Sequence, residues 1–310
     1  MTALSRVGTA RLATALLLAL TAAWGSTFFL IRDLVAHVPP ADFLAVRFAI
    51  AGAVMAMLFW RQTRALSRRD LGIGVVLGLL YGVAQVLQTT GLAHTDASVS
   101  GFITGTYVVL TPVLGALLLH DRISGVTWAA VALATAGLGI LSLRGLSVGV
   151  GEALTLASAA LYALHILALG RWSTPARAVG LSTVQAAVIA LVALVGALPG
   201  GITLPATGHQ WVSVLYMALV AGALALWAQT WAQAHLTSTR AAIVMAMEPV
   251  FAAFFAVWLG GESLTARMLL GGALVLAAMY LVELRGPRER RATGETALDE
   301  PPVEALHHDV

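Results

Sequence analysis

Long apolar runs are the feature of this sequence that most limits its fold. A membrane-crossing helix needs about 17–25 predominantly apolar residues. Ten segments of this kind, bounded by charged or turn residues, are Leu12–Ile31, Phe43–Trp60, Leu71–Leu92, Ala97–Leu119, Gly125–Leu143, Ala153–Gly170, Ala178–Leu198, Trp211–Ala234, Ala241–Leu259 and Ala266–Leu284. We therefore predict an all-α polytopic membrane protein with ten transmembrane helices, the first of which is retained rather than cleaved as a signal peptide.

The composition excludes a soluble domain and several kinds of chemistry. Hydrophobic residues form 59% of the 310 residues and charged residues only 11%, against about 25% charged residues in soluble domains. The chain has no Cys, and all 18 basic residues are Arg, which excludes disulfides, Cys-ligated metals, a lysine Schiff base and a Walker A loop. We expect no catalytic residues, no cofactor and no bound metal.

The distribution of arginine predicts the orientation in the membrane. Cytoplasmic loops are enriched in basic residues. With the N-terminus inside, the loops on the inner side hold Arg6, Arg11, Arg61, Arg64, Arg68, Arg69, Arg122, Arg171, Arg177, Arg240, Arg285, Arg288, Arg290 and Arg291, whereas the outer side holds Arg32, Arg144 and Arg267. We expect both termini to be cytoplasmic. Residues 286–310 are charged and contain prolines, so we predict a disordered cytoplasmic tail.

Polar residues recur at an offset of 141 residues between the two halves. Gln88-Thr89 matches Gln229-Thr230, and Asp121 matches Glu262. This pattern predicts two five-helix repeats, residues 12–145 and 146–285. Because five is an odd number, the second repeat must cross the membrane in the opposite direction, which gives the inverted repeats that recur in secondary transporters.

Several motifs resemble those of the EamA-type transporters of the drug/metabolite transporter superfamily. They are Trp24-Gly25-Ser26 with Phe28 and Phe29, Asp42-Phe43, Arg47-Phe48, Thr237 to Ala242, Met247-Glu248-Pro249-Val250 and Gly261-Glu262-Ser263-Leu264. The first-half counterpart differs from the family at Asp121-Arg122, where Gly-Glu or Glu-Arg is frequent. The resemblance implies a ten-helix carrier, frequently an exporter of amino acids and other metabolites, with a central cavity lined by helices 1, 3, 4, 6, 8 and 9.

Polar and aromatic residues within the apolar segments are the candidates for function. The candidate substrate-binding residues are Trp24, Gln85, Tyr107, Tyr162, His165, Trp227 and Glu248, and the candidate structural or gating residues are Arg47, Pro112, Pro249 and Glu262. For most of them taken singly, helix packing is the competing interpretation. Trp24 stands out because Gly25 and Ser26 beside it permit close approach.

The charged candidates each allow more than one interpretation. Arg47 lies roughly 6 Å below the outer edge of its segment; it could extend to the interface, bind a backbone carbonyl, or serve as a functional cation. Glu248 could bind a substrate ammonium, titrate, or accept hydrogen bonds from loop amides as a structural lock beside Pro249. His165 could relay protons or simply bind a carbonyl. Gly74, Gly78 and Gly82 indicate close helix packing.

The leading hypothesis is a secondary transporter of a small polar or amphipathic metabolite, amino-acid-like or drug-like, that works by alternating access and exports its substrate. The alternative is an intramembrane enzyme acting on a lipid-linked substrate. The expected partners are a small-molecule substrate and the lipid bilayer of the plasma membrane, with a homodimer as one open option. Scattered arginines give no basic face, so no nucleic acid is expected.

Overall fold

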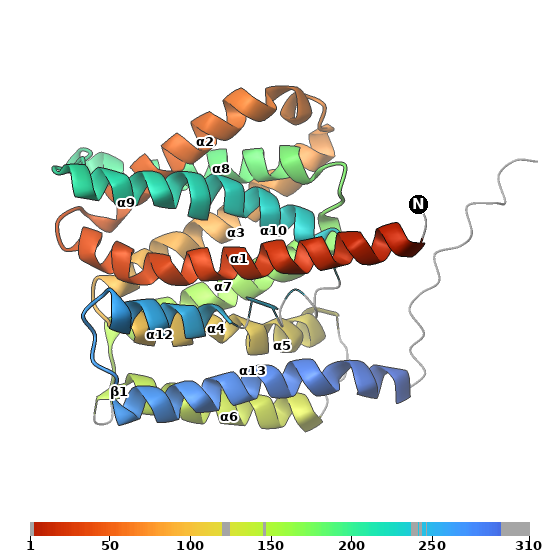
Figure 1. The fold of residues 1–310 in the computed structure, drawn as a ribbon. Helices are drawn as coiled ribbons and strands as arrows, with labels where there is room; N and C mark the ends of the chain where they lie inside the picture. Colours follow the sequence, from red (N-terminus) through yellow and green to blue (C-terminus); the bar gives the residue numbers. More distant parts are fainter. Residues whose placement is uncertain are drawn as a thin grey trace, which may run out of the picture.

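Helices form nearly all of the described chain. The structure is a computed structural model that describes residues 3–119, 125–144, 147–236, 241, 244–245 and 247–292. Its elements are α1 (Ala3–Val35), α2 (Pro40–Arg64), α3 (Arg68–Leu92), α4 (Ala97–Gly105), α5 (Tyr107–Leu119), α6 (Gly125–Ser142), β1 (Leu143–Arg144), β2 (Ser147–Val148), α7 (Val150–Trp172), α8 (Ala178–Ala197), η1 (Leu198–Gly200), α9 (Gly208–Ala218), η2 (Leu219–Leu224), α10 (Ala225–Gln233), α12 (Glu248–Trp258) and α13 (Ala266–Ala292). The helices run roughly along one direction, with the α6–α13 pair forming an outer layer (Figure 1).

The apolar segments predicted from the sequence largely coincide with helices where the structure describes them; residues 242–243 and 246 of the ninth segment lie outside the described residues. Seven helical stretches of the described chain are long and apolar enough to cross a membrane, and three shorter apolar helices lie at Trp128–Gly137, Glu248–Trp258 and Ala266–Leu281. The protein is therefore a multi-pass membrane protein. Ten crossings remain a prediction, because the three shorter helices do not meet the length of a span.

Local sequence signals explain several helix starts. Ser67 caps α3 by accepting a hydrogen bond from the Asp70 amide at 3.1 Å, and Thr207 with Gln210 forms a reciprocal capping box at α9. The second helix starts at Pro40, in the first turn where proline lacks no needed amide donor. Between the halves, β1 and β2 form a two-residue antiparallel pair that flanks the predicted repeat boundary.

The glycines of α3 confirm the helix-packing interpretation. A Cβ atom at Gly74 would lie 2.8 Å from the Val184 side chain, and one at Gly78 would lie 2.7 Å from that of Val188. At Gly82 the backbone of Ile189 would be 3.3 Å away. The glycine face of α3 therefore lets α8 approach to backbone contact, as small residues do between membrane helices.

The main contacts between helices of the first half and helices of the second half have counterparts in which the two halves swap roles. The second helices pack on each other (α2 on α8), as do the last helices (α6 on α13) and the fourth (α4 on α12). Contacts between helices of different rank occur in both directions. The third helix of each half packs on the first helix of the other (α3 on α7, α10 on α1), and the first helix of each half packs on the fourth of the other (α1 on α12, α7 on α4 and α5). This is the contact pattern of a pseudo-two-fold arrangement of two similar halves.

The last helix extends past the boundary predicted for the tail. The predicted disordered tail begins at residue 286, yet α13 continues to Ala292. Arginine and glutamate are good helix formers, and the Arg288-Glu289-Arg290-Arg291 run extends the helix beyond the apolar segment. Residues 293–310 lie outside the described residues, as do Asp121 and Arg122.

Candidate functional site

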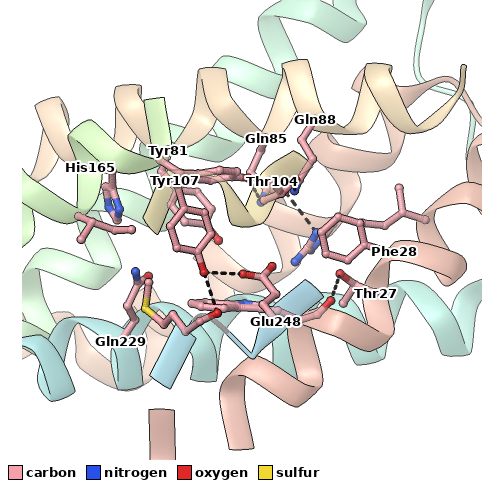
Figure 2. Close-up of a pocket in the computed structure, with 16 residues that line it drawn as sticks. Thr27, Phe28, Tyr81, Gln85, Gln88, Thr104, Tyr107, His165, Gln229 and Glu248 are labelled. Carbon is pink, nitrogen blue, oxygen red and sulfur yellow. Dashed lines mark hydrogen bonds between the residues drawn. The ribbon is translucent and has the colours of Figure 1, made fainter. Parts of the chain in front are cut away.

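A cavity lies between helices of both halves, close to the junction of α4 with α5 and to the start of α12. Its lining comprises Trp24, Thr27, Phe28 and Ile31 of α1, Arg47 of α2, Tyr81, Gln85 and Gln88 of α3, Thr104 of α4, Tyr107 of α5, Tyr162, His165 and Ile166 of α7, Gln229 of α10, Met245, and Glu248 of α12 (Figure 2). The cavity measures about 40 Å³ at the centres of water-sized spheres, which is room for a few water molecules. The cavity is therefore small in this structure.

Arg47 is a buried cation in this lining. Its side chain is only 2% exposed, so the alternative in which it extends to the interface is wrong. Its guanidinium donates to the carbonyls of Met217 at 3.0 Å and Ala221 at 3.2 Å, and more weakly to Gln85 Oε1 at 3.4 Å. A guanidinium has five N–H donors, so two remain for a ligand.

A π-helical turn supplies one of the two carbonyl groups that hold Arg47, and the end of α9 supplies the other. Leu219–Leu224 is π-helical, and such turns frequently occur at functional sites. The Ala221 carbonyl within it also accepts a hydrogen bond from Trp24 Nε1 at 3.1 Å. Because carbonyls carry only partial charge, Arg47 keeps a net positive charge that no carboxylate of the described residues neutralises.

Glu248 is the buried anion of the same cavity. It is 6% exposed and is the first residue of α12. Its Oε2 accepts a hydrogen bond from the Tyr107 hydroxyl at 2.9 Å, and the same hydroxyl lies 3.1 Å from the Met245 carbonyl (Figure 2). Among the described residues no loop amide donates to Glu248, and the partner of its carboxylate is the Tyr107 hydroxyl.

Tyr107 and Glu248 mark equivalent helix breaks. They are 141 residues apart, which is the offset of the repeat. α4 gives way to α5 at Thr106, and α12 begins after Met247, again 141 residues later. The Tyr107–Glu248 hydrogen bond therefore joins the starts of two corresponding helices, one from each half. Discontinuous helices of this kind form substrate sites in transporters.

A chain of hydrogen bonds fixes the polar wall that α3 and α7 provide. Gln85 Nε2 donates to the Tyr162 hydroxyl at 2.6 Å, and that hydroxyl donates to Gln88 Oε1 at 2.9 Å. Gln88 Nε2 donates in turn to Thr104 Oγ1 at 3.0 Å. Since each member of this chain is buried and paired, the wall is held rigidly for a ligand.

A cluster of charged residues lies at one end of the bundle. Arg32, at the end of α1, pairs with Asp96 at 2.8 Å and with Glu262 at 3.0 Å. Glu262 also accepts hydrogen bonds from the Ala97 amide at 2.7 Å and the Ser98 amide at 3.3 Å, at the start of α4. This Arg32 cluster lines a second pocket of about 460 Å³. It links the end of α1 with the start of α4 and with Glu262, which follows α12.

The structure brings together most of the candidate residues that were named from the sequence. Trp24, Gln85, Tyr107, Tyr162, His165, Glu248 and Arg47 all line the cavity. Trp227 does not: it lies half-buried and stacks on Trp231, with ring centroids 6.4 Å apart. It is two residues from Gln229, about 200° around the helix, so Gln229 takes the inward face. Pro112 and Pro249 stand within or at the start of helices outside the lining.

Sequence reasoning missed several lining residues. Tyr81, Thr27, Ile31, Thr104, Ile166 and Met245 were not named. Phe28 was named only as part of a family motif, and Gln88 and Gln229 only as matching positions of the repeat. Tyr81, Gln85 and Gln88 follow the i, i+4, i+7 spacing of one helix face. That spacing would have added Tyr81, whereas the apolar members carry no signal that separates them from lipid-facing residues.

Comparison with known proteins gives the family. The model of the EamA-like transporter family matches this chain twice, over residues 11–143 and 149–284. The chain belongs to the EamA-like transporter family. An uncharacterized transporter from Archaeoglobus fulgidus is 31% identical over 263 residues, which cover 84% of this chain and 82% of that protein. A crystal structure with 19% identity and a TM-score of 0.64 covers 91% of this chain and 99% of its own, and supports the fold.

Membership in this family decides between the two functional hypotheses. The protein is a membrane transporter and not an enzyme, so the alternative of an intramembrane enzyme is wrong. Its partners are the lipid bilayer and a small-molecule substrate. The cavity described above is therefore the candidate substrate site of an EamA-family transporter.

Proposed function

We propose that this EamA-family protein is a secondary transporter that exports a small amino-acid-like metabolite by alternating access. The observation that carries the substrate class is the pair of opposite charges in one cavity: Arg47 and Glu248 are both buried there and do not pair with each other. A buried unpaired charge is costly. A zwitterion supplies a carboxylate for Arg47 and an ammonium for Glu248, and so compensates both.

The contacts define a role for each end of the substrate. Arg47 has two free N–H donors, which suit the two oxygens of a carboxylate. Glu248 receives only one hydrogen bond from a described residue, that of Tyr107, which leaves acceptor capacity for an ammonium. Trp24 and Tyr81 add aromatic surface to the lining of the same cavity.

Transport of a metabolite requires this small cavity to expand. We propose that two inverted five-helix repeats, ten spans in all, rock against each other with both termini in the cytoplasm of a plasma-membrane protein. The double family match, the interchangeable helix contacts and the paired helix breaks support two repeats. In this topology the Arg32 cluster lies outside and keeps the outer end closed. The direction of export rests on the resemblance to known family members.

Counterflow in proteoliposomes tests the proposed substrate class. The purified transporter is reconstituted in vesicles loaded with one unlabelled amino acid, and uptake of a labelled one is followed across a panel. We expect exchange of zwitterionic amino acids and at least tenfold weaker exchange of the matching amino-acid amides, which lack the carboxylate, and N-acetyl amino acids, which lack the ammonium. Equal exchange of single-charge derivatives and zwitterions would contradict the proposal.

A further inference from the structure

Two buried hydrogen-bonding atoms in the cavity lining have no protein partner. They are Gln229 Oε1 and His165 Nδ1, and neither forms a hydrogen bond with the described part of the chain. Gln229 is 3% exposed and His165 is fully buried. Buried polar atoms are nearly always paired. Two unpaired acceptors on residues that line one cavity therefore point to a ligand that would donate hydrogen bonds to them.

The surroundings of His165 define the kind of atom it offers. Gln185 Nε2 donates to the Leu181 carbonyl at 3.2 Å, which turns Gln185 Oε1 toward the imidazole, 2.9 Å from His165 Nε2. An amide oxygen only accepts, so Nε2 carries the ring proton. No carboxylate of the described residues contacts the ring, and in the neutral imidazole Nδ1 is then an acceptor, as Gln229 Oε1 is.

The corresponding positions in the first half are satisfied within the protein. At the offset of 141 residues, Gln229 corresponds to Gln88 and His165 to Trp24. Gln88 is paired with Tyr162 and Thr104, and Trp24 donates to the Ala221 carbonyl. The unpaired acceptors are therefore not a general consequence of the repeat but belong to one side of the cavity.

We infer that Gln229 and His165 form a side-chain subsite for a neutral hydrogen-bond donor on the substrate. This inference rests on the proposed function and narrows it to zwitterions whose side chain carries a hydroxyl or a carboxamide. Two neutral acceptors favour an O–H or N–H donor, whereas they do not neutralise a second charge. Both residues lie on the same side of the Tyr107–Glu248 pair in Figure 2, apart from the carboxylate that would hold the ammonium.

Pairs of amino acids with nearly equal shape test the subsite. Threonine and valine differ by a hydroxyl and a methyl group, and asparagine and leucine differ by a carboxamide and an isopropyl group. In the counterflow assay we expect the wild type to prefer threonine to valine, and asparagine to leucine, by about tenfold or more, because an apolar side chain leaves the buried acceptors unpaired. Equal affinities within both pairs would overturn the inference.

A matched pair of variants assigns the preference to the subsite. Gln229→Leu removes the acceptor and should bring both ratios close to one. Gln233→Leu is the control, because Gln233 lies one turn further along α10, is 4% exposed and also has no described partner, yet does not line the cavity. We expect this control to keep the wild-type ratios; an equal loss in both variants would overturn the inference.

The outcomes separate this inference from the proposed function. A wild type that exchanges no zwitterion refutes the proposed function. A wild type that exchanges zwitterions without preferring donor-bearing side chains refutes only the subsite. Thermal unfolding of each variant is measured beside transport, and should Gln229→Leu fail to fold, the substrate ratios of the wild type still decide the inference.

Discussion

The hydrogen bond between Tyr107 and Glu248 permits the two roles of Glu248 to be measured separately. Glu248→Gln keeps an oxygen that can accept from the Tyr107 hydroxyl at its present position but removes the charge that would hold an ammonium. We predict that exchange is lost while the melting temperature stays nearly unchanged. Counterflow and thermal unfolding in detergent, measured on the same preparation, check this.

Tyr107→Phe is the complementary variant. It removes one hydroxyl and leaves the carboxylate. Because a hydrogen bond to a charged group contributes about 1.5–3 kcal/mol, we expect the free energy of unfolding to fall by about that amount while exchange continues at a reduced level. A Glu248→Gln protein that transports normally, or that melts far below the Tyr107→Phe protein, would contradict the substrate role of Glu248.

At the level of residues, the sequence predicted the polar members of the cavity better than their neighbours. Placing a charged or amide side chain such as Arg47 or Gln85 within a membrane-spanning segment costs free energy. Such residues are therefore rare there, and their presence identified them as candidates. The sequence could not show that Arg47 binds the Met217 carbonyl 170 residues away. It also misplaced Trp227, because large aromatic residues suit a cavity and a helix interface equally well.

Within single elements, the glycines of α3 give a direct test of packing against α8. Gly78→Ala places a Cβ 2.7 Å from that of Val188, so we predict a loss of about 1–3 kcal/mol of stability from overpacking. Gly72 in the same helix has no atom within 4 Å of such a Cβ, and Gly72→Ala should leave stability unchanged or raise it. Thermal unfolding of the two variants checks the difference, and equal destabilisation would contradict the assigned α3–α8 contact.

The Arg32 cluster predicts how one end of the bundle opens. Arg32→Gln removes the pairing of α1 with Asp96 and Glu262. Because these ion pairs are partly exposed and worth ~0–1 kcal/mol, we expect a several-fold rise in the open population. The chain has no native Cys, so a Val99→Cys reporter in the pocket beside the Arg32 cluster is the single thiol of the protein. This reporter should react with a thiol reagent several-fold faster in the Arg32→Gln protein than in the protein that keeps Arg32.

The control for this prediction is the ion pair between Arg177 and Asp70, which joins α8 to α3 instead. Arg177→Gln in the same reporter background should leave the reaction rate of Val99→Cys unchanged. Equal acceleration by both substitutions would indicate general loosening and contradict a closing role for the Arg32 cluster.

Helix positions were predictable at this scale, whereas helix irregularities were not. Apolar length alone located each helix, since water-free surroundings force the backbone to satisfy its own hydrogen bonds. Pro249 indicated a discontinuity before α12. The equivalent break at Thr106 carries no proline, and the π-helical turn at Leu219–Leu224 has no sequence signal, because both depend on contacts with other helices.

For the whole molecule, the proposed arrangement of two inverted repeats predicts which loops face outward. His37 follows α1 and Ala176 precedes α8, and both are exposed. With the N-terminus inside, we predict that a His37→Cys variant reacts with a membrane-impermeant thiol reagent in intact cells. An Ala176→Cys variant should react only after permeabilisation. The opposite labelling pattern, or labelling of both sites in intact cells, would contradict the topology.

The overall plan could be derived from the sequence because a duplication leaves polar residues at a constant offset. Gln88 and Gln229 indicated the offset of 141 residues. Tyr107 and Glu248, which are separated by the same offset, are hydrogen-bonded to each other. The size of the cavity and the ion pairs of the Arg32 cluster could not be derived, since both depend on how helices distant in the sequence pack against each other.

The most direct test of the central claim is a crossed binding measurement, because the claim assigns one charge of the substrate to Arg47 and the other to Glu248. Binding of an amino acid, its amide and its N-acetyl derivative is measured by calorimetry for the wild type, Arg47→Gln and Glu248→Gln. We predict that the wild type binds the free amino acid at least tenfold more tightly than either derivative, that Arg47→Gln no longer distinguishes it from the amide, and that Glu248→Gln no longer distinguishes it from the N-acetyl form. The same discrimination in all three proteins would contradict the account.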